Sequence, residues 1–259
     1  PRVALREPSP PHAREDRSEP GTTHGVSATR PRSGYAVRGS WHPPRPEHLR
    51  ILHSAHFVKC VGVGSSADMI APRTEGRKFI GIDFTKDPLP TGHFERCSFA
   101  RCSFTRADIA ARTFLDCAFE TCELSMARIT RTSIRECAFR HCKLLGVSFD
   151  HGQTNLFSAD FTDCIMDSCS FQGIALQRTH FMGCRMHAAD FTRADLSGVA
   201  FERCDLTDAV FEGCDLQRSD FRTAHGFVID PEQNRMKGAR FALDGLPGLL
   251  ARHGLQVDH

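Results

Sequence analysis

A large apolar residue returns at every fifth position through residues 79–149 and again through residues 156–221. In the first run this residue is Phe, Leu or Ile, and in the second run Met also occurs. An α-helix repeats every 3.6 residues and a β-strand every 2 residues, so neither element alone produces a period of five. The chain is therefore expected to fold as a solenoid, in which each short repeat packs on its neighbours.

A second, smaller residue lies two positions before each large one from Phe99 onward, and Arg112 is the exception in size. Residues two apart in an extended segment point to the same side. Both members of each pair can therefore face one interior.

Eleven of the 12 cysteines occupy this smaller position. A free Cys packs as a small hydrophobe, whereas zinc requires thiolates that converge in a tetrahedron. We therefore expect buried core thiols, no metal and no cofactor, and a reducing, cytoplasmic location. Steps of 20 residues place nine of them in three ladders: Cys97, Cys117 and Cys137; Cys102, Cys122 and Cys142; and Cys164, Cys184 and Cys204.

The segments Ala159-Asp160-Phe161, Ala189-Asp190-Phe191 and Ala194-Asp195-Leu196 resemble the Ala-(Asp/Asn)-Leu-x-x pattern of the pentapeptide-repeat family. The resemblance implies an all-β fold, a right-handed quadrilateral parallel β-helix with four pentapeptides in each 20-residue coil. Residues 20 apart would then stack. We assign residues 69–229 to this β-helix.

Residues 1–68 differ in composition, being rich in Pro and Arg and lacking an apolar period. Such a segment cannot bury enough apolar surface to offset its ordering entropy, so a disordered arm is expected. Because Met69 is the first methionine, two alternatives stay open: a native arm, or a segment that is not part of the native protein.

Two irregularities interrupt the regular repeat. The first is a break in phase that predicts a small partner-binding loop, with a merely tolerated insertion as the alternative; it comprises Asp150, His151, Gly152, Gln153, Thr154 and Asn155. The second is residues 230–259, which predict a cap with a short C-terminal helix, either alone or with a two-fold dimer contact. The dimerisation residues expected there are Phe241, Leu243, Leu246, Leu249 and Leu250.

Charge is uneven along the repeats. Residues 69–149 hold 13 basic and 9 acidic residues, whereas residues 150–229 hold 6 basic and 12 acidic ones. The pattern favours either a solvated surface or an acidic stripe that a cationic, DNA-binding groove would accept, and Asp195 and Asp215 would stack in it. The predicted acidic surface comprises Asp160, Asp190, Asp195, Glu202, Asp205, Asp208, Glu212, Asp215 and Asp220.

Three segments, 122–126, 142–149 and 230–235, resemble the topoisomerase-protecting branch of the family, which includes the quinolone-resistance Qnr proteins and immunity proteins of microcin and albicidin producers. The resemblance implies a homodimer that mimics DNA, binds DNA gyrase or topoisomerase IV and relieves poisoning by a drug or toxin. It implies no direct binding to nucleic acid. The alternative is a scaffolding repeat protein with another protein partner.

An enzyme is not expected, and we assign no catalytic residue. The sequence contains no nucleophile elbow, His-Glu-x-x-His motif or phosphate-binding loop. His141, His180 and His187 fall on the walls without acids at a set spacing. No membrane association is expected either.

Overall fold

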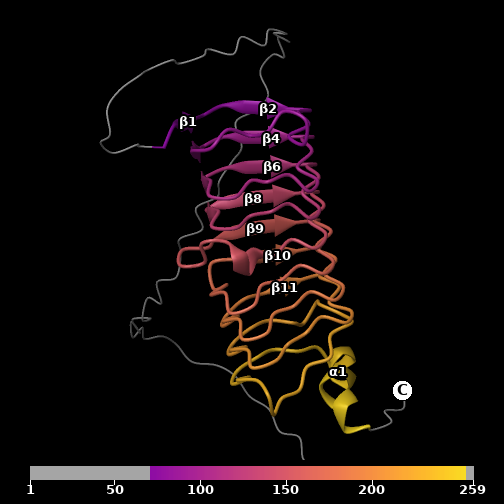
Figure 1. Cartoon of the computed structure of the whole chain (residues 1–259). Helices are drawn as coiled ribbons and strands as arrows, with labels where there is room; N and C mark the ends of the chain where they lie inside the picture. The colour runs from indigo at the N-terminus through magenta and orange to yellow at the C-terminus, as the bar shows by residue number, and fades with distance from the viewer. Residues whose placement is uncertain (1–70, 255–259) are drawn as a thin grey trace, which may run out of the picture. The chain divides into compact units, whose positions relative to one another are not determined.

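The computed structural model describes residues 71–254, and this part forms a parallel β-helix within the compact unit Gly64–His259 (Figure 1). Predictions for residues 1–68 lie outside the described residues, and so does Cys60, the twelfth cysteine. The strands are β1 (Arg73–Glu75), β2 (Lys78–Ile80), β3 (His93–Glu95), β4 (Ser98–Ala100), β5 (Thr113–Leu115), β6 (Ala118–Glu120), β7 (Ser133–Arg135), β8 (Cys137–Arg140), β9 (Ala159–Thr162), β10 (His180–Met182) and β11 (Phe201–Glu202). Helix α1 (Pro247–Leu250) follows, and three 3₁₀ turns lie at Phe149–His151, Leu243–Gly245 and Ala251–His253.

The strands stack as rungs, with β1-β3-β5-β7 in one sheet and β2-β4-β6-β8-β9-β10-β11 in another. Single bridges continue the walls where strands are not formed. We number the four walls in chain order: face 1 contains Phe79, face 2 Phe84, face 3 Leu89 and face 4 Phe94, each with the residues stacked on it. This is the quadrilateral parallel β-helix that the resemblance to the pentapeptide-repeat family implies.

The predicted large positions form the core. All of them are buried except Leu156. On face 1 every rung is Phe, and consecutive rings stack with centroids 4.7–5.5 Å apart. Close aromatic contacts add to the stabilisation from burial. The stacked rings are Phe79, Phe99, Phe119, Phe139, Phe161, Phe181, Phe201, Phe221 and Phe241.

The exception is a correction to the predicted phase. Leu156 is 50 % exposed, and Phe157 is buried in its place, with its ring 5.6 Å from that of Phe149. Gln153 still pairs with Ser133, so the two extra residues enter after Gln153 and the chain turns inward one residue late.

The same insertion changes the register from 20 to 22 residues, since Phe139 pairs with Phe161. Lys143 accordingly bridges to Ile165, which aligns Cys142 with Cys164. Two of the three predicted thiol ladders are therefore one ladder of six: Cys102, Cys122, Cys142, Cys164, Cys184 and Cys204.

All eleven cysteines of the described part are buried and free. The thiols that donate hydrogen bonds do so to main-chain carbonyl oxygens of their own coil, of the preceding coil or of both. Cys122 Sγ, for example, donates to the Phe99 oxygen at 3.3 Å. Burial raises the pKa of Cys169 to about 12 and that of Cys214 to about 11. Burial thus favours the neutral thiol at these two positions.

We expect these eleven thiols to resist a thiol-labelling reagent in the folded protein, because the thiolate is the reactive form and neither it nor the reagent is accommodated in the core. The measurement is labelling of a Cys60→Ser variant, monitored by mass, in buffer and in guanidinium. Labelling should follow global unfolding. Rapid labelling of several cysteines without denaturant would contradict the burial of these thiols in a well-packed core.

Arg112 occupies a small inward position yet remains buried. Its guanidinium donates to the carbonyl oxygens of Ala110 at 2.8 Å and Pro90 at 3.1 Å, and also to that of Leu89. Burial lowers the pKa of Arg112. The side chain thereby satisfies main-chain groups in the segment between β2 and β3, where the coil is irregular.

Between residues 71 and 254, no helix combines the length and apolar character needed to cross a bilayer.

Candidate partner-binding surface

The predicted acidic residues are spread over all four faces rather than along one stripe. Bridges between coils place Asp205 on face 2, Asp190 on face 3, and Asp195 with Asp215 on face 4. Asp208 occupies the corner between faces 2 and 3, where its φ is 58°. The members on face 1 are Asp160, Glu202 and Asp220, and Glu212 follows Phe211 on face 3.

Most of these aspartates have a structural role in their own turn. The Asp195 carboxylate accepts a hydrogen bond from the Ser197 amide at 3.0 Å, and Asp190 accepts one from Thr192 at 2.8 Å. Asp205, Asp215 and Asp220 make the same contact two residues ahead. Such Asx turns satisfy the amide that bends away from the wall. An Asn would keep this bond and remove the charge.

Two of the carboxylates lie beside histidines. The Asp205 carboxylate is 2.7 Å from His187 Nε2 and 3.5 Å from His225 Nδ1. Although burial pushes the pKa of Asp205 upward, hydrogen bonds from His187 and Thr207 outweigh it and hold that pKa at about 2. Asp160 Oδ1 lies 2.7 Å from His180 Nδ1, and this hydrogen bond raises the pKa of His180.

Arginines neutralise three more of the predicted acids. Arg235 Nη1 lies 2.8 Å from Asp215, and Arg222 Nη2 lies 2.7 Å from Asp220. The hydrogen bond from Arg222 lowers the pKa of Asp220. Arg240 and Arg252 approach Asp220 and Glu212, each at 3.5 Å. Within residues 71–254, no ion pair forms with Asp190, Asp195, Glu202 or Asp208.

The predicted loop lies at the corner of faces 3 and 4. Asp150 and His151 belong to a 3₁₀ turn, and their side chains lie 3.7 Å apart. Gln153 bridges to Ser133 of β7, while Gln153 and Asn155 are exposed. Gly152 and Thr154 are half-buried. The structure therefore brings all six predicted loop residues together at one corner.

Polar atoms near this loop lack partners. Of the described buried side-chain nitrogen and oxygen atoms, four form no hydrogen bond: Ser133 Oγ, Arg135 Nε, Asp150 Oδ1 and Thr179 Oγ1. The first two belong to β7, beneath the loop, and the third belongs to the loop. Native structures leave few such groups unpaired, so this concentration is unusual.

The C-terminal segment caps the last coil, with α1 beside it in Figure 1. Phe241 extends the stack of rings, and Leu249 packs on the core. The other three predicted dimerisation residues point outward, and Leu243 is 87 % exposed; the set is Leu243, Leu246 and Leu250.

Two glycines allow this cap to dock. An added Cβ would lie 2.8 Å from the Phe227 ring at Gly245 and 2.2 Å from the Phe227 oxygen at Gly248. The Ile229 amide donates to the Gly248 oxygen at 3.1 Å. Arg252 approaches Asp230 at 3.7 Å in addition to its contact with Glu212. The sequence analysis did not identify these contacts.

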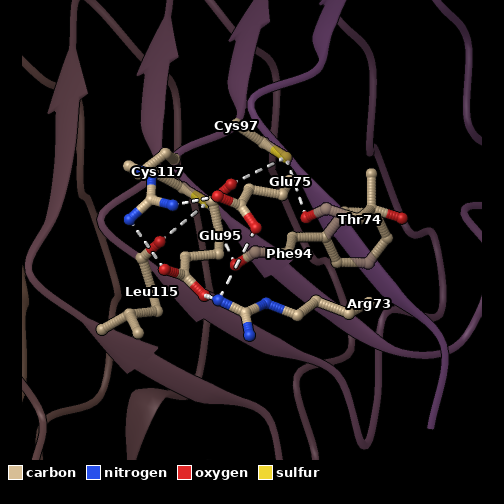
Figure 2. A network of polar contacts seen from close by, with 9 residues as sticks. Arg73, Thr74, Glu75, Phe94, Glu95, Cys97, Leu115 and Cys117 are labelled. Atoms are coloured by element: carbon tan, nitrogen blue, oxygen red, sulfur yellow. Dashed lines mark hydrogen bonds and ion pairs between the residues drawn. The ribbon is translucent and has the colours of Figure 1, made fainter.

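A second feature missed from sequence is an ion-pair network on the first coils of face 4, shown in Figure 2. Arg73 pairs with Glu95, and Arg96 pairs with Glu75 and, at 2.9 Å, with Glu95. Because β1 and β3 are neighbouring rungs, these exposed pairs tie the first coil to the second. They are typical of surface stabilisation rather than of a site.

No three His, Cys, Asp or Glu side chains within residues 71–254 are arranged to hold a metal ion.

Comparisons with known proteins agree with this architecture. A pentapeptide repeat region model matches residues 154–225. One trypsin-treated variant of QnrB1, a plasmid-mediated fluoroquinolone resistance protein, has 18 % identity and a TM-score of 0.58, covering 75 % of this chain and 94 % of that chain. Another has 19 % identity and a TM-score of 0.50, covering 72 % and 100 %.

HetL from the cyanobacterium Nostoc, a pentapeptide repeat protein involved in heterocyst differentiation regulation, has 15 % identity and a TM-score of 0.35, covering 69 % of this chain and 90 % of that chain. No curated protein sequence matches the chain significantly.

Proposed function

We propose that this chain, which belongs to the pentapeptide-repeat proteins, binds a bacterial type II topoisomerase, DNA gyrase or topoisomerase IV, in place of DNA. Binding would give resistance or immunity to a topoisomerase poison. The observation that carries the proposal is the acidic half of the β-helix, residues 150–229, where 12 acidic residues outnumber 6 basic ones.

A cationic groove built for DNA attracts other regular arrays of negative charge. Carboxylates one coil apart, such as Asp195 and Asp215, repeat along a rigid wall as phosphates repeat along a duplex. Such complementarity mainly accelerates association and suppresses wrong partners. The same charge disfavours direct binding of nucleic acid by this half.

The resemblance of segments 122–126, 142–149 and 230–235 to topoisomerase-protecting proteins supports the same function. QnrB1, which shares the fold, is a fluoroquinolone resistance protein. We further propose a cytoplasmic protein, because eleven free buried thiols suit a reducing compartment.

A scaffolding protein with a different partner is the second candidate. The observation favouring it is local neutralisation: Asp205, Asp215 and Asp220 each lie beside His or Arg side chains, which weakens the field that a DNA-binding groove would meet.

The test is competition. The full chain is titrated into gyrase or topoisomerase IV holding a fluorescent DNA duplex, and anisotropy is followed. Displacement that weakens as salt rises from about 50 to about 300 mM, a range over which the Debye length falls from roughly 14 to roughly 6 Å, supports mimicry. Unchanged anisotropy with both enzymes, at concentrations up to hundreds of micromolar (on the order of a weak non-specific Kd), would favour the scaffold.

A homodimer is proposed from the apolar residues that the cap leaves outside. Leu246→Asp combined with Leu250→Asp should convert dimers into monomers, because two exposed leucines that the proposed two-fold contact would cover become two charges. Multi-angle light scattering gives the mass, and Met182→Asp, an exposed site on β10, is the control. A dimeric mass for the double variant would rule out tail-mediated pairing.

A further inference from the structure

We propose that the topoisomerase binds along the face 3–4 edge, defined as the loop Asp150–Asn155 together with Asp190 and Asp195 on the adjoining walls. This inference rests on the proposed function and names the surface that performs it. The partner chemistry is a cationic groove that also offers hydrogen-bond donors and acceptors to the loop.

The position of the loop supports this edge. Asp150 follows Phe149 on face 3, whereas Gln153 is bridged to Ser133 on face 4, so the loop turns the corner between the two walls. The two extra residues enter after Gln153 and leave Leu156 exposed. The register between neighbouring coils changes here from 20 to 22 residues, which interrupts the regular wall at this corner.

Unpaired polar atoms give an independent indication. Ser133 is 2 % exposed, and its Oγ has no hydrogen-bond partner, as is also true of Arg135 Nε and Asp150 Oδ1. Leaving such a buried group unpaired is unfavourable, because it loses its hydrogen bonds to water and gains none in the protein. A partner that moves the loop or inserts its own polar groups would recover this energy on binding.

The carboxylates with no cation lie next along the same edge. Asp190 hydrogen-bonds to Thr192 and Gln172, and Asp195 to the Ser197 amide, all neutral groups. Arg193 lies between them in sequence; its Cγ lies beside Gly213, and its guanidinium forms no ion pair in the described structure.

Faces 1 and 2 differ in this respect, with Glu202 of face 1 as the exception. Their aspartates are held by side chains of the neighbouring coil or the same turn, as Asp205 is by His187 and Asp220 by Arg222. Asp167 likewise receives two hydrogen bonds from Arg185 Nε and one from its Nη2. A cationic groove would have to break these pairs before it could use the charge.

Two charge-matched variants separate the surfaces. Asp190→Asn with Asp195→Asn removes two charges from the face 3–4 edge while an amide oxygen keeps each Asx turn. Asp163→Asn with Asp167→Asn removes two charges on the opposite side, from face 2 and its corner with face 1. In the competition assay we expect the first pair to weaken binding about tenfold, equivalent to about 1.4 kcal/mol, and the second less than twofold.

Two single substitutions to arginine test the same surface while leaving every acidic residue unchanged. Ala175 bridges to Asp195 on face 4, and Ala200 bridges to Asp220 on face 1, so Ala175→Arg and Ala200→Arg each place a cation one coil from an Asp. Only Ala175→Arg should weaken binding. Circular dichroism confirms that all four variants remain folded.

The outcomes are distinct. Binding that survives both edge variants, or is lost equally with the opposite-side variants, overturns the face 3–4 edge and leaves the proposed function standing. A complete lack of binding by the unchanged protein overturns the proposed function and this surface with it.

Discussion

Replacing Phe181 with Ala is expected to lower the free energy of unfolding by about 3–5 kcal/mol, the cost of deleting a buried aromatic ring. Phe181 is buried between the rings of Phe161 and Phe201, with centroids 5.5 and 5.3 Å away, and it also meets the edges of Phe171 and Phe191. The resulting cavity cannot collapse readily, because a rigid rung lies on either side. Guanidinium unfolding followed by circular dichroism measures the change.

The neighbouring residue is the control. Met182 is on the same strand but points outward, so Met182→Ala should change stability by about 0.5 kcal/mol or less. Equal effects of the two substitutions would show that the ladder of rings is not the main source of cohesion along the β-helix.

The second large effect concerns the cap. Gly248→Val is expected to expel α1 from the end of the β-helix, because a Cβ at this position would lie 2.2 Å from the Phe227 oxygen, a main-chain atom that cannot move aside. Overpacking of this kind costs about 1–3 kcal/mol. The bond from the Ile229 amide to the Gly248 oxygen would be lost with it.

Thermal unfolding and light scattering together check this prediction. Ala251→Val introduces the same side chain at an exposed position of the same segment and should change neither readout. If Gly248→Val retained the melting temperature and mass of the unchanged protein, the close approach of the cap to Phe227 would not be needed for docking.

The fold could be predicted from sequence because its cause is local and repeated. A large and a small inward residue in every pentapeptide define the interior without long-range information. Leu156 was misassigned because two extra residues allow either Leu156 or Phe157 to resume the inward pattern. The structure buries the larger aromatic ring of Phe157, which packs edge to face against Phe149.

The candidate surface was less accessible from sequence. The acids could be listed, but a list does not show which wall each one occupies or what lies beside it. A signal did exist: Asp160 and His180, like Asp215 and Arg235, are one 20-residue coil apart. Applying the coil period to charges as well as to apolar residues would have shown these pairs.

Other features left no such signal. The glycine contacts of the cap depend on the path of the chain after the last regular coil. The unpaired Ser133 hydroxyl depends on the position of the loop next to β7. Both features occur where the chain departs from the five-residue repeat, and there the repeat no longer predicts the path of the chain.

DNA supercoiling by purified gyrase in the presence of a fluoroquinolone is the most direct test of the central claim. The full chain is titrated into the reaction, and supercoiled and cleaved DNA are separated on agarose gels, with topoisomerase IV decatenation run in parallel. A DNA mimic that protects the enzyme should reduce cleaved complex and restore supercoiling, and the Asp190→Asn/Asp195→Asn variant should do so less well. Cleaved DNA that stays constant with both enzymes across the titration would contradict topoisomerase protection.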